Sequence, residues 1–286
     1  MHTVLSSPTK QVTIGHDQPF VIIGERINPT GRKLFQERLR NDDLSTVVTD
    51  VQDQVAGGAD MLDVNMGVPL VDEPQLLAKA VKLVQSLTDV PLCIDSSVIE
   101  ALEAGLAAYE GKALVNSMTG EDDRMDAILP MIKKHDAAIL ALPNDETQIP
   151  MLASERMVIV EKIVRRVEKE GISLENLLID PLAMPVGADP ENVKNTLETI
   201  YQVREKYGLN MSIGASNTSF GLPNRHALNA AFIPMAMAMG LTSAIMDSRT
   251  PEVVTATRAA DMLLGLDPSV ILQQDRNRMA AHRIFR

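Results

Sequence analysis

A (β/α)8 barrel, in which eight parallel strands alternate with eight helices, is the fold that this sequence predicts. The first observation is that short apolar runs alternate with longer helical segments from about residue 20 to about residue 265. The second is that most of these runs end in, or carry close to their end, a carboxylate or a carboxamide. The third is the count of eight strand–helix pairs, because the rival fold, a doubly wound sheet, usually has about five or six strands.

Each predicted strand is a short run rich in Val, Ile, Leu, Met or Ala, which is typical of a buried strand. A polar side chain at the end of such a run is costly to bury without partners. Because the carboxyl ends of barrel strands meet at one mouth, we expect these polar ends to lie together there. In chain order the predicted strands are Phe20–Glu25, Met61–Asn65, Pro91–Asp95, Ala113–Asn116, Ala137–Leu142, Leu177–Asp180, Met211–Ser216 and Ser243–Asp247.

The segments between the strands have helical patterns, and several stop at a glycine, the residue expected just beyond a helix carboxyl terminus. Ser96 and Ser97 are placed to cap the third helix. A long loop, Arg26–Asp43, separates the first strand from the first helix. In chain order the predicted helices are Leu44–Ala56, Glu73–Leu87, Val98–Tyr109, Arg124–His135, Ser154–Glu170, Pro190–Tyr207, Arg225–Met239 and Pro251–Leu264.

The chain is interpreted as one barrel domain over residues 1–286, with its core at about 20–265 and a C-terminal tail at 266–286. No internal repeat, low-complexity segment or interdomain linker is visible. Hydrophobic residues make up 45% of the chain, which is enough for a large core. The tail is rich in Gln and Arg, and we expect it to dock on the barrel or to fray.

The composition excludes several classes of protein. A net charge of −11 argues against a nucleic-acid-binding surface, which needs a basic footprint. No apolar run approaches the roughly 18 residues that span a bilayer, and residues 1–18 lack the apolar segment of a signal peptide. We therefore expect a cytoplasmic protein without membrane contact. The single cysteine excludes an internal disulfide, and the scattered histidines predict no bound metal.

Four polar residues end, or directly follow, four different predicted strands: Asp95, Asn116, Asp180 and Asn217. Asp63 or Asn65 can join them from the second strand. One such residue is more often a helix cap or loop anchor than a ligand group, but four at matching strand ends are hard to explain in that way. A carboxylate accepts two parallel hydrogen bonds, and a carboxamide both donates and accepts. The group therefore suits a flat heterocycle with N–H donors along one edge.

Two further polar residues lie at the end of the first predicted strand and just after it. These are Glu25 and Asn28, which either line the mouth or cap the loop.

Six motifs in consistent order then make the resemblance to a known family specific. The chain resembles the pterin-binding barrel family, most closely the methyltetrahydrofolate:corrinoid methyltransferases and the folate-binding barrel of cobalamin-dependent methionine synthase. The resemblance extends from about Phe20 to Gly265 and implies the same (β/α)8 barrel. The motifs are GERINPTGR (Gly24–Arg32), DVN (Asp63–Asn65), CIDSS (Cys93–Ser97), VNS (Val115–Ser117), IDP (Ile179–Pro181) and GASNTS (Gly214–Ser219).

The resemblance implies a role for each matching residue. Asp95, Asn116 and Asp180 match the residues that bind the pterin edge. Asn217 matches the asparagine that approaches the pterin nitrogen bearing the methyl group. Asp63 and Asn65 match a motif near the ring, and Arg225 matches an arginine after the seventh strand. Phe220 departs from some corrinoid-type relatives, which have Gln at its position.

The implied reaction moves a methyl group between 5-methyltetrahydrofolate or tetrahydrofolate and the cobalt of a corrinoid (cobalamin). A methyl group on a tertiary amine has a poor leaving group unless the nitrogen gains a proton or a hydrogen bond. Asn217 is the candidate catalytic residue, because its amide can donate a bond that strengthens as the lone pair develops. The D-x-H-x-x-G run of corrinoid-binding modules does not occur here, so we expect a separate corrinoid protein as partner.

Two alternatives remain open. Dihydropteroate synthase, in the same fold, handles a diphosphate leaving group and needs cationic groups near it. The segment Gly214–Gly221 has no cationic residue here, and the first one that follows is Arg225. A non-catalytic folate-binding subunit would bind the pterin without transferring a methyl group. A homodimer is also predicted. It rests on the family resemblance and on two helices rich in Ala and Met, Arg225–Met239 and Pro251–Leu264.

Overall fold

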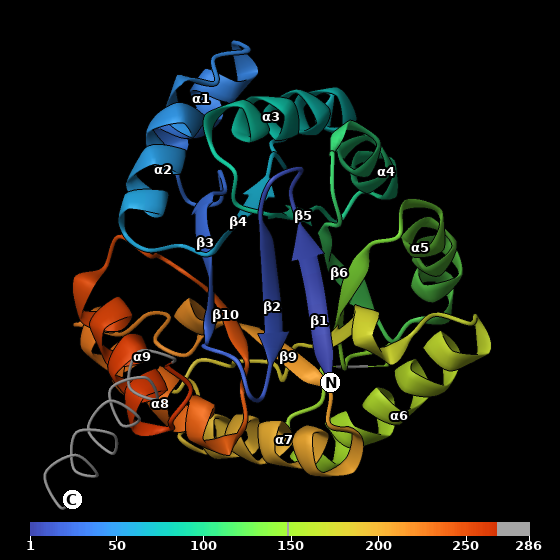
Figure 1. Cartoon of the computed structure of the whole chain (residues 1–286), viewed down its shortest axis with the longest axis vertical. Coiled ribbons are helices and arrows are strands. Elements are labelled where there is room, and N and C mark those ends of the chain that lie inside the picture. Colours follow the sequence, from blue (N-terminus) through green and yellow to red (C-terminus); the bar gives the residue numbers. More distant parts are fainter. Residues whose placement is uncertain (148, 268–286) are drawn as a thin grey trace, which may run out of the picture.

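The computed structural model describes residues 1–147 and 149–267, and its centre is a closed barrel of eight parallel strands (Figure 1). Neighbouring strands follow the order β10-β3-β4-β5-β6-β7-β8-β9, so the sheet has no free edge. The predicted fold class is therefore confirmed. The barrel strands are β3 (Val21–Ile27), β4 (Met61–Asn65), β5 (Leu92–Asp95), β6 (Leu114–Thr119), β7 (Ala138–Leu142), β8 (Leu177–Ile179), β9 (Asn210–Gly214) and β10 (Ser243–Met246).

Helices surround the barrel, and the eight predicted ones are present as α2 to α9. One more helix, α1, lies inside the segment predicted as a long loop. It has only eight residues, about two turns, and buries only Phe35 and Leu39, so it is easily overlooked within a long connecting segment. The helices are α1 (Lys33–Arg40), α2 (Ser45–Ala56), α3 (Glu73–Leu87), α4 (Ile99–Ala108), α5 (Asp122–His135), α6 (Ala153–Lys169), α7 (Glu191–Tyr207), α8 (Arg225–Met239) and α9 (Pro251–Leu263).

The apolar core has two compartments, because side chains alternate between the two faces of each strand. Outward residues such as Ile22 and Leu62 pack against the helices. Inward residues fill the barrel, and the buried Cys93 is one of them. The barrel interior contains Val21, Ile23, Met61, Cys93, Leu114, Ala138, Leu140, Leu178 and Ile245.

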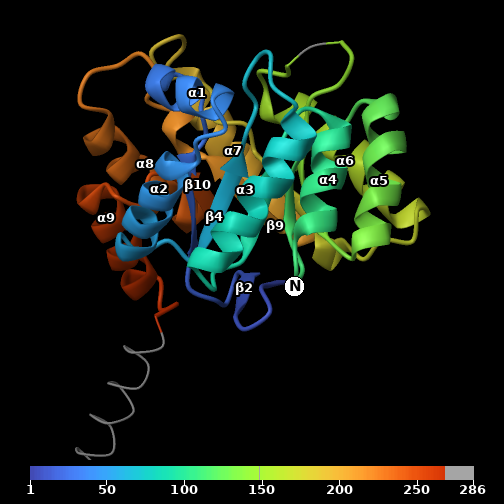
Figure 2. The same cartoon turned by 90° about the horizontal axis from the view of Figure 1, so that it is seen from above.

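A short hairpin, which the sequence analysis missed, closes the amino-terminal end of the barrel. Strands β1 (His2–Ser6) and β2 (Gln11–Gly15) pair in antiparallel fashion and lie opposite the mouth loops (Figure 2). Leu5, Val12 and Ile14 belong to the same buried cluster as the barrel interior. The hairpin was missed because its alternating pattern covers only five residues in each strand.

Several hydrogen bonds attach the hairpin to the barrel and its helices. The Tyr109 hydroxyl donates to the Ser6 carbonyl at 2.8 Å. The buried Asn210 amide of β9 donates to the Ile14 carbonyl at 2.9 Å. The hairpin is therefore a fixed plug, and the carboxyl-terminal mouth remains as the accessible end. The part of the chain that the structure describes has no helix long and apolar enough to cross a bilayer.

Two neighbouring residues of β1 test the plug. We expect Leu5→Ala to lower the free energy of unfolding by about 2–4 kcal/mol, because a fully buried side chain leaves a cavity. Val4→Ala is the matched control, since Val4 is 38% exposed and should cost less than about 1 kcal/mol. Urea unfolding followed by circular dichroism measures both, and equal losses would show that the hairpin does not pack into the barrel.

Candidate functional site

A layer of polar side chains lies directly above the apolar interior of the barrel. Inward residues recur every second position along a strand, so the residue two places after an inward apolar residue also faces inward. At the carboxyl ends of six strands this next inward residue is polar. The inward pairs are Ile23 and Glu25, Met61 and Asp63, Cys93 and Asp95, Leu114 and Asn116, Leu178 and Asp180, and Ile245 and Asp247.

Two hydrogen-bonded pairs connect the predicted residues of β4, β5 and β6. Asn116 donates from Nδ2 to Oδ1 of Asp63 at 3.1 Å. Asn65 donates from Nδ2 to Oδ2 of Asp95 at 2.9 Å, and its own Oδ1 accepts from the Gly67 amide at 2.8 Å. The strand register places Asn65, Asp95 and Asn116 at one level. The structure thus brings together four of the predicted residues in one network.

The carboxyl groups of Asp63 and Asp95 interact in this network. Asp63 is 2% exposed, and burial together with the nearby Asp95 charge raises its pKa well above the usual range. Burial also raises the pKa of Asp95, although hydrogen bonds from Asn65 and Asp63 act in the opposite direction. Protonated Asp63 can donate a hydrogen bond to Asp95, which then remains the carboxylate at the mouth.

Asp180 stands just after β8, where its Oδ1 accepts a hydrogen bond from the Leu182 amide at 2.8 Å. Burial raises the pKa of Asp180 to about 6, although the amides of Leu182 and Gly214 and the charge of Arg156 favour its ionised form. Asp180 is therefore both a loop anchor and a carboxylate that faces the mouth, two roles that the sequence could not separate.

Asn217 lies beyond the strand that was predicted to carry it. Strand β9 ends at Gly214, and a short 3-10 turn over Ala215–Asn217 brings Asn217 to the rim. Asn217 is exposed, and its side chain has no hydrogen-bond partner among residues 1–147 and 149–267. A Cβ at Gly214 would lie 3.0 Å from Asn217 Nδ2, so this glycine leaves room for the amide.

Arg225 lies at the first position of α8 and is bound to the rim loop itself. Its Nη2 donates to the Ser216 carbonyl at 2.7 Å, and its Nε donates to the Ser219 hydroxyl at 3.1 Å. The guanidinium also lies 5.9 Å from the centroid of the exposed Phe220 ring. These contacts make Arg225 a support of the loop that carries Asn217.

Three residues near the first and last barrel strands have distinct surroundings. Glu25 lines the mouth, where the Ser216 hydroxyl donates to its Oε1 at 2.8 Å. Asn28 is a loop cap, because its Oδ1 accepts from the Thr30 amide at 2.9 Å. Asp247 is paired with Arg249 through two bonds of 2.9 and 2.8 Å. Of the three, Glu25 has the surroundings of a site residue.

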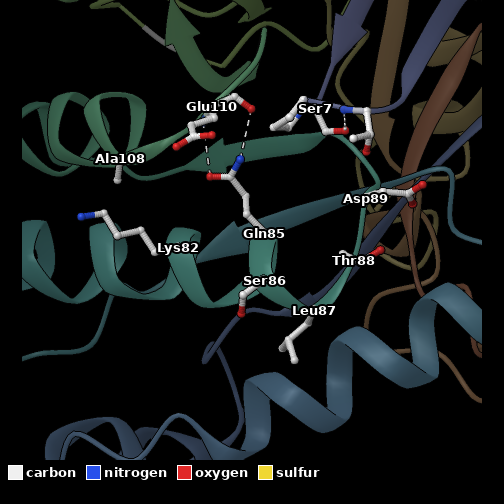
Figure 3. A pocket seen from close by; sticks show the side chains of 11 residues that line it. Ser7, Lys82, Gln85, Ser86, Leu87, Thr88, Asp89, Ala108 and Glu110 are labelled. Atoms are coloured by element: carbon white, nitrogen blue, oxygen red, sulfur yellow. Dashed lines mark hydrogen bonds between the residues drawn. The ribbon is translucent and has the colours of Figure 1, made fainter.

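The described part of the chain also has a pocket of about 590 Å³ at the other end of the barrel (Figure 3). It lies between the β1–β2 turn and the carboxyl ends of α3 and α4, and Gln85 there donates to the Glu110 carbonyl at 3.1 Å. A pocket of about 390 Å³ at the mouth includes Asp95 and Ser117. We place the site at the mouth despite the smaller volume, because buried polar groups converge there.

Comparison of the sequence with known proteins identifies relatives. The family model described as pterin binding enzyme matches residues 24–247. The methylcorrinoid:tetrahydrofolate methyltransferase of Eubacterium limosum is 31% identical over 253 residues, which cover 86% of this chain and 92% of that protein. The methionine synthase of Mycobacterium leprae is 31% identical over 242 residues. That match covers 79% of this chain, which spans about a fifth (20%) of the synthase.

Solved structures share the barrel. Dihydropteroate synthase of Yersinia pestis, with a pterine–sulfa conjugate, has a TM-score of 0.69 at 17% identity, covering 93% of this chain and 100% of that chain. The Xanthomonas albilineans enzyme with 4-aminobenzoic acid has a TM-score of 0.68 at 19% identity, covering 91% and 98%. At such identities the likeness shows the fold alone.

The raised pKa of Asp180 predicts a pH-dependent stability. Because the folded state holds this proton to about pH 6, wild-type stability falls as the pH rises from about 4 through 6. Asp180→Asn removes this loss, so we expect the variant to gain about 1–3 kcal/mol relative to wild type between pH 4 and pH 8. Urea unfolding at both pH values measures it, with the exposed Asp53→Asn as control for one lost charge. A constant difference between Asp180→Asn and wild type would contradict the prediction.

Proposed function

This chain belongs to the pterin-binding enzyme family, and we propose that it moves a methyl group between 5-methyltetrahydrofolate and the cobalt of a corrinoid carried by a separate protein. One observation carries the proposal. Buried carboxylates and amides form the floor of the mouth, while the exposed Asn217 amide at the rim has no partner in the described ranges. The E. limosum relative, with 31% identity over most of both chains, supports the same reading.

The floor suits the hydrogen-bonding edge of a pterin. The carboxylates of Asp95 and Asp180 can each accept bonds from ring N–H and amino groups. Asn116 uses one amide hydrogen on Asp63, so its Oδ1 and its second hydrogen stay available to the ring. Asn65 uses both ends of its amide within the protein, so we assign it to support Asp95. Asp63 has the same supporting role toward Asn116.

The chemistry then needs a donor at the nitrogen that carries the methyl group. In transfer to the corrinoid substrate, the methyl group would leave N5 for Co(I), the electron pair of the N5–CH₃ bond would stay on N5, and N5 would take a proton from solvent. The Asn217 amide can donate to N5 as its lone pair develops, which stabilises the transition state more than the ground state. In the reverse direction, which the name of the E. limosum relative describes, N5 attacks the methyl group and loses its proton.

The same loop disfavours dihydropteroate synthesis. A diphosphate leaving group needs cationic groups near it, and the residues from Gly214 to Gly221 include none. Arg225, which follows, already donates to Ser216 and Ser219. This argument does not apply to a folate-binding subunit without catalysis. The experiment therefore has to measure folate binding and the rate of methyl transfer separately.

We also propose that the protein forms a homodimer through α8 and α9. These helices pack side by side (Figure 1), and between Ala227 and Met239 α8 has no charged residue. Its outward residues Leu228, Ala231, Met235 and Ala238 are apolar and exposed. On α9, Met262 is 52% and Leu263 89% exposed. A second copy would cover this stripe, which is unusual for a solvated helix.

The function predicts separate effects of Asn217→Ala on rate and on affinity. With 5-methyltetrahydrofolate and free cob(I)alamin, we expect single-turnover methyl transfer to slow by about 10²–10³ fold, because one preorganised donor is lost. Folate affinity, measured by calorimetry, should fall much less, since the ground-state amine is a weaker acceptor.

Asn41→Ala, in an exposed asparagine at the end of α1, is the matched control and should change neither quantity. Equal losses of rate and affinity would make Asn217 a binding residue. Folate binding without transfer by the wild type would favour the non-catalytic subunit, and preference for a pterin diphosphate would favour the synthase.

The dimer predicts that charge on α8 separates the subunits. Met235→Glu places a carboxylate in the centre of the apolar stripe, and we expect the molar mass in solution to halve at micromolar concentration. Val158→Glu, at an exposed position of α6, is the control and should leave the dimer intact. Light scattering coupled to size exclusion measures both, and a monomeric wild type would reject the dimer.

A further inference from the structure

Arg156 is a buried cation that the sequence analysis did not single out. It lies in the first turn of α6 and is 0% exposed, and burial lowers its pKa. Within the described ranges it has no ion pair with a carboxylate. A buried charge without a counterion at contact distance is costly, so its hydrogen bonds must offset the lost hydration. The partners of three of these hydrogen bonds are backbone carbonyls of two loops at the mouth.

The guanidinium binds the two loops that leave β7 and β8. Its Nε donates to the Pro150 carbonyl at 3.1 Å. Its Nη1 donates to the carbonyls of Pro181 at 2.7 Å and Leu182 at 3.0 Å. The Thr196 hydroxyl of α7 also donates to the Leu182 carbonyl at 2.9 Å. Arg156 therefore contacts both residues that directly follow Asp180.

One peptide unit connects Arg156 with the Asp180 carboxylate. The carbonyl of Pro181 and the amide of Leu182 belong to the same planar group and point in opposite directions. The carbonyl accepts from Arg156 at 2.7 Å, while the amide donates to Asp180 Oδ1 at 2.8 Å. Such a chain polarises the peptide, so the amide becomes a stronger donor to the carboxylate.

The backbone of this loop needs external support. Leu182 has φ 60°, a left-handed conformation that a branched side chain adopts at a cost. Such residues persist where surrounding contacts determine the conformation. The bonds from Arg156 and Thr196 to the Leu182 carbonyl provide those contacts and thereby fix the direction of its amide.

We propose that Arg156 is the positioning residue of the pterin site, which holds Asp180 toward the mouth and in its ionised form through the Pro181–Leu182 peptide unit. The consequence for the ligand, a reduced pterin, rests on the proposed function. The link between Arg156 and Asp180 does not, because it is a property of the free protein.

The charges around both groups are few in the described part of the chain. Burial is the main influence on the pKa of Asp180 and raises it, while the Leu182 and Gly214 amides and the charge of Arg156 lower it, and Arg156 is the charged group among them. The charged groups that act on Arg156 are Asp180 and Glu155. A residue that only connected two loops would stabilise the fold without changing the ionisation of Asp180. The two roles therefore differ in a measurable quantity.

The first measurement uses the wild-type protein without ligand. The buried Nη1 of Arg156, which donates to the Pro181 carbonyl, and the Leu182 amide nitrogen should both show ¹⁵N chemical shifts that titrate with the carboxyl carbon of Asp180, at one shared midpoint. In Asp180→Asn these titrations should disappear. An Arg156 resonance that does not respond at the Asp180 midpoint overturns the proposal, and this result needs no Arg156 variant to fold.

The second measurement removes the charge. In Arg156→Gln we expect the Asp180 midpoint to rise by about one pH unit, because a nearby opposite charge is lost. For a ligand that needs ionised Asp180, tetrahydrofolate affinity then falls about fivefold at pH 6 and less than about twofold at pH 8. Arg156→Lys keeps the charge and should have a midpoint between the two. Arg165→Gln, in an exposed arginine of the same helix, should match the wild type.

The outcomes separate this proposal from the proposed function. An unchanged Asp180 midpoint in a folded Arg156→Gln overturns the positioning role, even where methyl transfer is confirmed. An affinity loss that is equal at all pH values overturns it in the same way, because it indicates a structural role. Absence of tetrahydrofolate binding by the wild type would reject the proposed function, while the ligand-free titration still decides the role of Arg156.

Discussion

The constraint on which this structure depends is the burial of inward-facing carboxyl groups near the carboxyl-terminal ends of the parallel strands. Strand alternation directs the residue two places beyond an inward apolar side chain into the same desolvated space. At β4, β5 and β8 that residue is Asp63, Asp95 or Asp180. Because an isolated buried charge is costly, each of these groups has amide donors or a shared proton. The site is therefore assembled wherever the apolar interior of the barrel ends.

The two ends of the barrel have different requirements. At the amino-terminal end, the hairpin covers the interior with Leu5, Val12 and Ile14, and stability is its evident role. At the mouth, burial raises the pKa of Asp63 and Asp180, which makes the folded protein less stable at neutral pH than an apolar closure would. Binding sites commonly carry this kind of cost, because the groups that bind a ligand are left incompletely paired.

Two arginines stabilise the loops that carry site residues. Arg225 binds the loop that carries Asn217, and Arg156 binds the loop that follows Asp180. In both cases a guanidinium satisfies backbone carbonyls, which a planar group with several donors does well. The family's sequence motifs contain the residues at the mouth, whereas these arginines come from the starts of α8 and α6. Their effect on the site is indirect, through the backbone.

The sequence by itself determined the barrel and the eight surrounding helices, since these follow from local periodicity and from the strand–helix count. It also placed Asp95 at the end of its strand, whereas β6 continues past Asn116 to Thr119 and β8 ends one residue before Asp180. Tertiary structure alone decided the rest. The hairpin strands and α1 are short, with five residues in each strand and eight in the helix, and Arg156 resembles a solvated residue in a helix of mixed charge. Which polar groups bind one another depends on strand register and loop conformation, and neither is encoded in the spacing of residues along one segment.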